Sequence, residues 1–398
     1  NLDMTRGKPS AEQLELSMEL QKYPLPSGFV LEDGTDLRNY GGLDGFKEAK
    51  MLFSKYLEVE YDEIIIGGNS SLNMMYDSMV RAMLFGVPPV NKPWGKGNEV
   101  RFICPCPGYD RHFTICESLG IKMIPVGMKE DGPDMDAVES LAGQDASIKG
   151  IWCVPKYSNP TGTVYSDSVI ERLSAMKCAA DDFRIFYDNA YTVHYLEPLG
   201  FISQKNLLRA SQKAGNPNRP IIFGSTSKIT FPGAGVAMLA ASRANSGNIK
   251  KHLSAQTIGP DKINIQRHIQ FFSDIDGIHR HMERHAAVLR PKFDAVDEVL
   301  ERELSGKKIA SWTRPKGGYF VSLDTLEGCA RETVRLAAEA GVKLTNAGAT
   351  YPYSKDPRDR NIRIAPSMPT LQEIWTAMEV VAICVQIASI NSILRKSC

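Results

Sequence analysis

The sequence lacks an excess of charge of one sign, a long apolar run and a dense set of cysteines. Its 398 residues include 47 basic and 46 acidic side chains, which gives a formal net charge of +1. This balance gives no support to a globally basic nucleic-acid or membrane binder. No apolar run reaches the roughly 18 residues of a membrane span, and no signal peptide opens the chain. We therefore expect a cytoplasmic protein that binds neither nucleic acid nor a membrane.

Metal chemistry also has little support. The eight cysteines include one close pair, Cys104 and Cys106, and no second pair stands at zinc-finger spacing. We expect reduced thiols, as is usual in the cytosol. His279, His281 and His285 cluster in a predicted helix, but His281-Met-Glu-Arg-His285 does not complete a zincin motif. The expectation is a solvated helix face and no metal site.

Short β-branched runs alternate with helical stretches through the first two thirds of the chain, whose length suggests two or three domains. Strands are predicted at 63–67, 100–104, 122–126, 150–154, 184–187, 221–224 and 236–240. Their continuous apolar character suits strands covered on both faces. A helix is predicted over 72–85, and another over 169–180, where Ser168 and Glu171 form a capping-box pattern. The alternation predicts an α/β domain with a mainly parallel sheet.

Four short motifs follow predicted strands, at the edge where open α/β sheets bind ligands. The first is a glycine-serine turn before a helix, made of Gly68, Asn69, Ser70 and Ser71. Its free backbone N–H groups could bind an anion, although an ordinary helix cap has the same pattern. The second is Asn159-Pro-Thr-Gly, which is functional or a simple turn.

The other two motifs carry charge. Asp188 closes a predicted buried strand, where a carboxylate needs a cationic partner such as a protonated cofactor nitrogen; a helix cap is the alternative. Lys228 stands beside Ser225 and Ser227 at another strand end. It is either a surface lysine or a desolvated amine able to form a Schiff base.

Taken together and in this order, the motifs resemble those of fold-type I pyridoxal-phosphate aminotransferases. The closest match is the aspartate aminotransferase-like subgroup, related to the aminotransferase domain of MocR regulators. The resemblance covers essentially the whole chain and includes Arg6-Gly-Lys-Pro, Asn39-Tyr-Gly-Gly and Asn361-Ile-Arg363. It implies a large domain (40–275) with a mainly parallel seven-stranded sheet, a small α+β domain (1–39 and 276–398), and a homodimer with shared sites.

The resemblance also implies a role for each motif residue around pyridoxal 5′-phosphate. Lys228 would bind the cofactor as a Schiff base and later carry the substrate proton. Asp188 would pair with the ring nitrogen. Asn159 and Tyr191 would hydrogen-bond the phenolic oxygen, with Asn159 also near the substrate, and Tyr109 would stack on the ring.

Phosphate and substrate contacts follow from the same resemblance. Ser225, Ser227 and the Gly68–Ser71 turn would hold the phosphate, and Tyr40 would reach the phosphate of the neighbouring subunit. Arg363 would bind the substrate α-carboxylate through two parallel hydrogen bonds. Gly7 would let the N-terminal strand pass close to that carboxylate. Many relatives carry a phosphate-binding Arg eight residues after the lysine, where this chain has Val236.

The expected reaction is ping-pong transfer between aspartate and 2-oxoglutarate. A dicarboxylic substrate needs a second cation, and the sequence leaves Arg6, Lys8, Lys156 and Lys262 as candidates. An aminotransferase of other specificity, or a lyase or decarboxylase using the same cofactor, stays open. A different class is the effector-sensing domain of a transcription regulator, which the five residues before Arg6 and the near-zero net charge do not favour.

Overall fold

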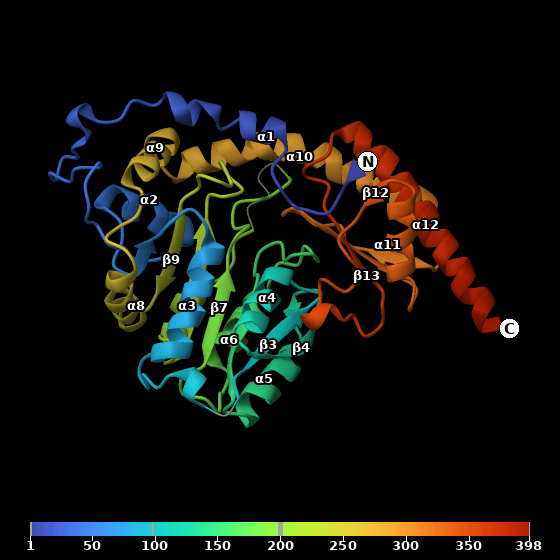
Figure 1. The fold of residues 1–398 in the computed structure, drawn as a ribbon, viewed down its shortest axis with the longest axis horizontal. Helices are drawn as coiled ribbons and strands as arrows, with labels where there is room; N and C mark the ends of the chain where they lie inside the picture. The colour runs from blue at the N-terminus through green and yellow to red at the C-terminus, as the bar shows by residue number, and fades with distance from the viewer. Residues whose placement is uncertain (1, 98, 198–201, 398) are drawn as a thin grey trace.

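The computed structural model describes residues 2–97, 99–197 and 202–397, and Figure 1 shows a large sheet body beside a smaller one. The large body is built on an eight-stranded sheet of order β2-β9-β8-β7-β6-β3-β4-β5. The strands are β2 (Ile64–Ile66), β3 (Arg101–Cys106), β4 (Lys122–Lys129), β5 (Gly132–Pro133), β6 (Ile148–Cys153), β7 (Arg184–Asp188), β8 (Pro220–Ser225) and β9 (Ala237–Ala241).

The predicted α/β fold with a mainly parallel sheet is confirmed, and all seven predicted strands form. β3, β4, β6, β7 and β8 are parallel neighbours, whereas β9 runs antiparallel to β8 and β2. The predicted number of strands is wrong by one. The additional strand, β5, is two residues paired antiparallel to the end of β4, too short to give a periodic pattern.

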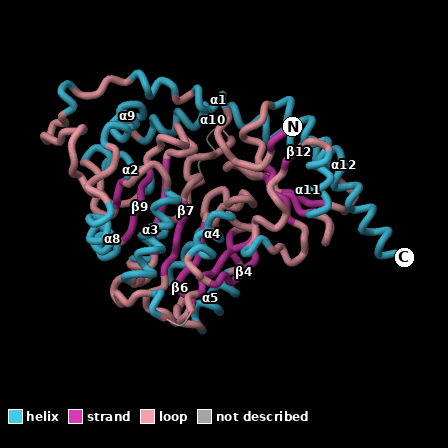
Figure 2. Tube along the Cα trace, in the orientation of Figure 1, coloured by secondary structure: helices cyan, strands magenta, loops and turns pink. Residues whose placement is uncertain are grey.

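Successive strand residues face two separate apolar clusters, one on each side of the sheet. Ile185 lies in one cluster and Phe186 in the other, and Ile222 and Phe223 divide in the same way. Both faces are covered by helices, as Figure 2 shows, so every residue of β7 is apolar or buried and polar. This covering explains the continuous apolar runs in the sequence.

The helices of the large body are α2 (Lys47–Leu57), α3 (Ser71–Phe85), α4 (Asp110–Ser118), α5 (Met135–Gln144), α6 (Asp167–Ala175), α7 (Leu207–Lys213), α8 (Arg243–Gln256) and α9 (Lys262–Phe272). The predicted cap of α6 is wrong. Ser166, not Ser168, accepts the Val169 N–H and also donates to Asp131, so the helix begins two residues earlier than predicted. Ser168 lies within the first turn.

The smaller body follows the 30-residue helix α10 (Ile275–Leu304). It contains β10 (Ala310–Trp312), β11 (Val321–Thr325), α11 (Ala330–Glu339), β12 (Val342–Lys343), β13 (Asn361–Ile364) and α12 (Leu371–Ser397). β10, β11 and β13 form an antiparallel sheet. The N-terminal β1 (Leu2–Asp3) pairs with β12, and α1 (Ala11–Glu15) packs on α10 (Figure 1). The short 3₁₀ turns are η1 (Met18–Lys22), η2 (Ser27–Phe29), η3 (Trp94–Lys96) and η4 (Pro352–Ser354).

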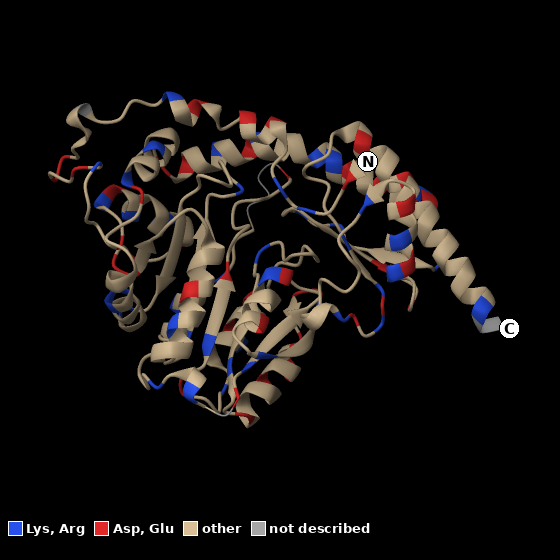
Figure 3. Ribbon diagram, viewed as in Figure 1, with Lys and Arg blue, Asp and Glu red and all other residues tan. Residues whose placement is uncertain are grey.

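Two features bear on the sequence-based expectations. His281 and His285 are buried on the inner side of α10, so the predicted solvated helix face is wrong for both. Within α12, Leu371–Arg395 is long and apolar enough by composition to cross a membrane, and 44% of it is buried inside the protein. One such helix is weak evidence for a membrane span, because core helices pass the same test. Figure 3 shows acidic and basic residues interspersed along the chain.

Candidate active site

A cavity of about 460 Å³ lies at the carboxyl ends of the central strands, where the two bodies and the N-terminal segment meet. Six residues predicted for the site line it: Gly7, Tyr109, Asn159, Tyr191, Lys228 and Arg363. The other lining residues are Thr5, Arg6, Lys8, Asp110, Arg111, Phe320, Leu344, Thr345 and Asn346. Five of the lining side chains are cationic and one, Asp110, is a carboxylate, so the cavity suits an anionic ligand.

Lys228 stands in the turn after β8, and its amine points over a tyrosine ring. Nζ lies 4.9 Å from the centroid of the Tyr191 ring. Burial lowers the pKa of the lysine amine, and the charge of Asp188 opposes that shift. A lowered pKa leaves more of the amine neutral near pH 7, which is the nucleophilic form.

Asp188 ends β7 and is buried. Its Oδ2 lies 3.0 Å from His112 Nε2, whereas Oδ1 is buried with no hydrogen-bond partner. A buried carboxylate oxygen without a partner is costly. A protonated ring nitrogen would satisfy this atom, so the residues present fit pyridoxal phosphate at the end of β7.

The sequence did not reveal His112, which holds the other oxygen of Asp188. Its ring stacks on Trp152, with centroids 4.3 Å apart and planes 7° apart, and meets the Tyr109 ring edge-on. His112 lies one helical turn after Tyr109, at the start of α4. That spacing was the one signal in the sequence, and it is common in helices.

Arg363 comes from β13 in the smaller body and reaches the large body. Nη1 lies 2.7 Å from Asp110 Oδ1 and 3.3 Å from Asn159 Oδ1. The guanidinium carbon lies 5.0 Å from the centroid of the Phe320 ring, and Nε is buried without a partner. The arginine is thus oriented into the cavity with donors to spare.

Gly7 is required by close packing. A Cβ at this position would lie 2.4 Å from Cζ of Phe320, the same ring that packs against Arg363. The predicted close approach of the N-terminal strand is therefore present, and Phe320 imposes it.

The glycine-serine turn lies beside the lysine turn rather than among the cavity-lining residues. Ser227 Oγ donates to Asn69 O at 2.9 Å, and Asn69 Nδ2 donates to Gly233 O at 3.1 Å. Ser70 is the N-cap of α3, since its Oγ accepts the Leu72 N–H. Gly68 precedes Asn69 in this turn, Ser71 is the first residue of α3, and Ser225 ends β8. The turn thus presents hydroxyls and the start of a helix near Lys228, as an anion site requires.

Val236 is buried in the core, and its N–H donates to Thr226 Oγ1 at 2.9 Å. This position supplies no cation. Tyr40 lies away from the cavity of its own chain and is 81% exposed. Its loop is anchored by Lys262, which donates to the carbonyls of Asn39 and Gly41.

Two candidates for the second cation are wrong. Lys262 is buried against the Tyr40 loop, and Lys156 lines a separate cavity beside Glu58. Arg6 and Lys8 do line the main cavity, together with Arg111, which sequence reasoning missed. Arg111 lies two residues after Tyr109 in a helix whose other charges are unremarkable in sequence.

The fold and the lysine-aspartate site define a fold-type I aminotransferase, a class that depends on pyridoxal phosphate. A family model described as aspartate amino-transferase matches residues 1–397, and the chain belongs to this family. An aspartate aminotransferase of Corynebacterium glutamicum is 46% identical over 388 residues, covering 98% of this chain and 89% of the relative. A Mycolicibacterium smegmatis protein assigned to the aminotransferases is 51% identical over 395 residues, covering 99% and 92%.

The structural comparison agrees. The crystal structure of an aspartate transaminase from Corynebacterium glutamicum superposes with a TM-score of 0.96 at 46% identity, covering 98% of this chain and 92% of the other. The predicted fold-type I architecture and aminotransferase class are therefore confirmed.

Proposed function

We propose that this protein is a pyridoxal-phosphate aminotransferase that exchanges the amino group of aspartate with 2-oxoglutarate by a ping-pong mechanism. The observation that carries the proposal is the pairing of Lys228, an amine of lowered pKa, with Asp188, whose buried Oδ1 has no partner. The 46% identical relative named aspartate aminotransferase supports the substrate.

The residues that would hold the cofactor surround this pair. Asp188, oriented by His112, would hold the ring nitrogen, and Tyr109 would lie against the ring. Asn159 and Tyr191 would bond the phenolic oxygen. The phosphate would lie at the Gly68–Ser71 turn with Ser225 and Ser227, with no cation from position 236. When bound, pyridoxal phosphate supplies an electron sink for the bonds at the substrate α-carbon.

The chain's own residues perform the remaining steps. Arg363 binds the substrate α-carboxylate with two hydrogen bonds and exchanges its contact with Asp110 for it. Lys228, released once the substrate amine takes its place, moves the proton from the α-carbon. Phe320 and the segment with Gly7 cover the cavity and exclude water.

The second carboxylate of aspartate needs a cation opposite Arg363. Arg6, Lys8 and Arg111 line the cavity, and one or more of them would serve. A cavity with this charge favours dicarboxylic substrates over alanine or leucine, because an unpaired cation discriminates against a neutral side chain.

We also propose the assembly and location. The enzyme would be a cytoplasmic homodimer in which the exposed Tyr40 enters the partner's phosphate site. Residues 40–275 would form the large domain, and residues 1–39 with 276–398 the small domain, which would close over substrate. The seven cysteines in the described residues are free, in keeping with a reducing compartment.

The test is a transamination assay on purified protein supplied with pyridoxal phosphate. We expect oxaloacetate from aspartate and 2-oxoglutarate, with kcat/KM for alanine or phenylalanine at least roughly 100-fold lower. Turnover only with another amino donor would retain the class and reject aspartate. Release of carbon dioxide or ammonia without an oxo-acid acceptor would indicate the lyase alternative. Cofactor binding without any turnover would indicate an effector-sensing domain.

A further inference from the structure

A buried polar network lies behind Lys228, on the side of its main chain away from the cavity. Its members come from four segments: Gln13 and Ser17 in and after α1, His194 after β7, His281 and His285 on α10, and Tyr319 before β11. All six side chains are buried. The proposed transamination steps use none of them.

The network holds two consecutive carbonyls. Tyr319 Oη donates to Lys228 O at 3.1 Å, and His194 Nε2 lies 3.4 Å from the same oxygen. On the next residue, His281 Nε2 lies 2.9 Å from Ile229 O. The peptide groups that follow the lysine are therefore fixed by side chains, in a turn between two strands where no sheet ladder fixes them.

Ser17 adds a second contact at Ile229. Its Oγ lies 3.4 Å from Ile229 O and 3.2 Å from His281 Nε2. The N-terminal segment thus reaches the lysine turn directly as well as through the histidines.

Gln13 connects the two halves of the network, and its orientation is set by a helix cap. Gln13 Oε1 accepts the Ser10 N–H at 3.1 Å, and Ser10 Oγ accepts the Gln13 N–H at 3.3 Å, which is a capping box. The amide nitrogen therefore points inward. It lies 3.0 Å from Tyr319 Oη and 2.9 Å from His285 Nδ1.

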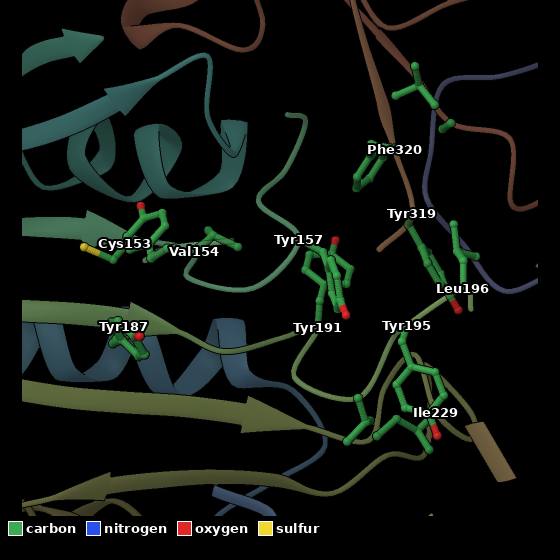
Figure 4. Packing of buried hydrophobic residues seen from close by; sticks show 14 of the residues in the cluster. Cys153, Val154, Tyr157, Tyr187, Tyr191, Tyr195, Leu196, Ile229, Tyr319 and Phe320 are labelled. Carbon is green, nitrogen blue, oxygen red and sulfur yellow. The ribbon is translucent and has the colours of Figure 1, made fainter. Parts of the chain in front are cut away.

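These contacts form a continuous path. Gln13 donates to the Tyr319 hydroxyl, which in turn donates to Lys228 O. On the other side, His285 Nε2 lies 3.1 Å from His281 Nε2, which touches Ile229 O. Tyr319 also faces the cavity side, with its ring centroid 6.1 Å from that of Tyr191 (Figure 4).

The histidines act here as uncharged groups. Burial lowers the pKa of His281 to about 4, of His194 to about 3 and of His285 to about 2. They place no cation beside the lysine near pH 7, so their effect on Lys228 is one of geometry.

We propose that Gln13 and Tyr319, supported by His285 and His281, are positioning residues that fix the Lys228 main chain and tie it to the N-terminal segment lining the cavity. The inference rests on the proposed function, in which the lysine amine leaves its first partner and must return to the substrate α-carbon. A side chain that leaves and returns needs an anchored main chain, because proton transfer requires hydrogen-bond distance. Gln13 lies only five residues beyond Lys8 of the cavity wall, so a ligand that orders this wall also tightens the anchor.

The test compares Tyr319→Phe, Gln13→Met and the double variant, each as holoenzyme and as apoprotein. We expect Tyr319→Phe to lower kcat for aspartate roughly 10-fold with KM changed less than about twofold, since the step affected is proton transfer. Gln13→Met should lower kcat in the same sense, and the double variant should equal Tyr319→Phe, because Gln13 acts through that hydroxyl. In the apoproteins, hydrogen exchange across residues 226–236 should quicken.

Trp94→Phe is the matched control for a lost buried hydrogen bond. Trp94 Nε1 donates to Asp182 Oδ2 at 3.0 Å, far from the lysine turn. This variant should lose thermal stability while its kcat and exchange across 226–236 stay at wild-type values.

Three results would overturn the proposal. Network variants that lose stability like Trp94→Phe but keep wild-type kcat would make the network merely structural. Additive effects in the double variant would separate Gln13 from Tyr319. Unchanged exchange in the apoproteins would reject the anchor itself. Failure of the proposed function would look different: wild-type protein would show no transamination, while the exchange measurement would still report on the anchor.

Discussion

Arg363 and Asp110 form an ion pair across the cavity, with Nη1 2.7 Å from Oδ1. The pair joins β13 of the smaller body to the first residue of α4. Arg363 is nearly buried and Asp110 is one-third exposed. Asp110 thus occupies a donor of Arg363 that the substrate α-carboxylate would use, and substrate binding must replace one carboxylate with another.

Asp110→Asn should therefore strengthen binding of an unreactive dicarboxylate such as succinate. A partly exposed ion pair contributes about 1 kcal/mol, which corresponds to a roughly fivefold lower inhibition constant. The measurement is competitive inhibition by succinate. Asp297→Asn, which breaks the ion pair with Arg314, is the control and should change nothing. A higher inhibition constant in Asp110→Asn would mean that Asp110 orients Arg363 rather than competing with substrate.

His112→Phe should impair the site while keeping an aromatic ring against Trp152. The substitution leaves both Asp188 oxygens without a side-chain partner, which costs about 1–3 kcal/mol of interaction. We expect kcat/KM to fall roughly 10- to 100-fold, measured in the transamination assay. His252 stacks on Phe85 with planes 10° apart but touches no site residue, so His252→Phe is the matched control. Equal losses in both variants would refute a specific role for His112.

Gly7→Ala should displace the N-terminal segment, because the new Cβ would lie 2.4 Å from Cζ of Phe320. We expect a several-fold higher KM for aspartate, since Arg6 and Lys8 flank this position in the cavity wall. Steady-state kinetics provide the measurement. Gly247→Ala, in α8 with open space around it, should leave KM unchanged and slightly stabilise the helix. A normal KM in Gly7→Ala would place the segment outside the substrate site.

Lys228 should titrate below the usual pH range of lysine in the apoprotein, since burial lowers its pKa. The charge of Asp188 raises that pKa, so Asp188→Asn should lower it further. Reductive methylation with formaldehyde, followed by peptide mass, measures the amine's reactivity against pH. The midpoint should move to lower pH in Asp188→Asn. Movement to higher pH would contradict the electrostatic account.

The same shift has a consequence for stability. The unfolded chain binds the Lys228 proton more tightly than the folded protein does. The free energy of unfolding of the apoprotein should therefore rise with pH as the pH approaches the ordinary lysine pKa from below. Lys228→Met should lack this increment, as denaturant titrations at several pH values would show. A wild-type profile parallel to that of Lys228→Met would contradict the lowered pKa.

The sequence predicted the parts of the site that are local in the chain. Lys228 and Asp188 stand at strand ends inside short motifs, and every predicted strand forms. The missed parts depend on long-range contacts. His112 meets Asp188 from 76 residues away, and Gln13 meets His285 from 272 residues away. Neither partner has a local pattern that singles it out.

The errors have similar physical causes. The α6 cap depends on Asp131, which bonds Ser166 from another segment. The two histidines predicted to be solvated are buried because α1 packs over α10 and supplies Gln13 as a polar partner. Helical spacing places them on one face but does not say what covers that face.

The most direct test of the central claim is the absorbance spectrum of wild-type protein and Lys228→Ala, each reconstituted with pyridoxal phosphate. The account predicts a visible band in the wild type, loss of that band on adding aspartate, and its return with 2-oxoglutarate. Lys228→Ala should show neither the band nor the cycle. A wild-type protein that forms no such band, or a Lys228→Ala variant that retains it, would contradict the assignment of Lys228.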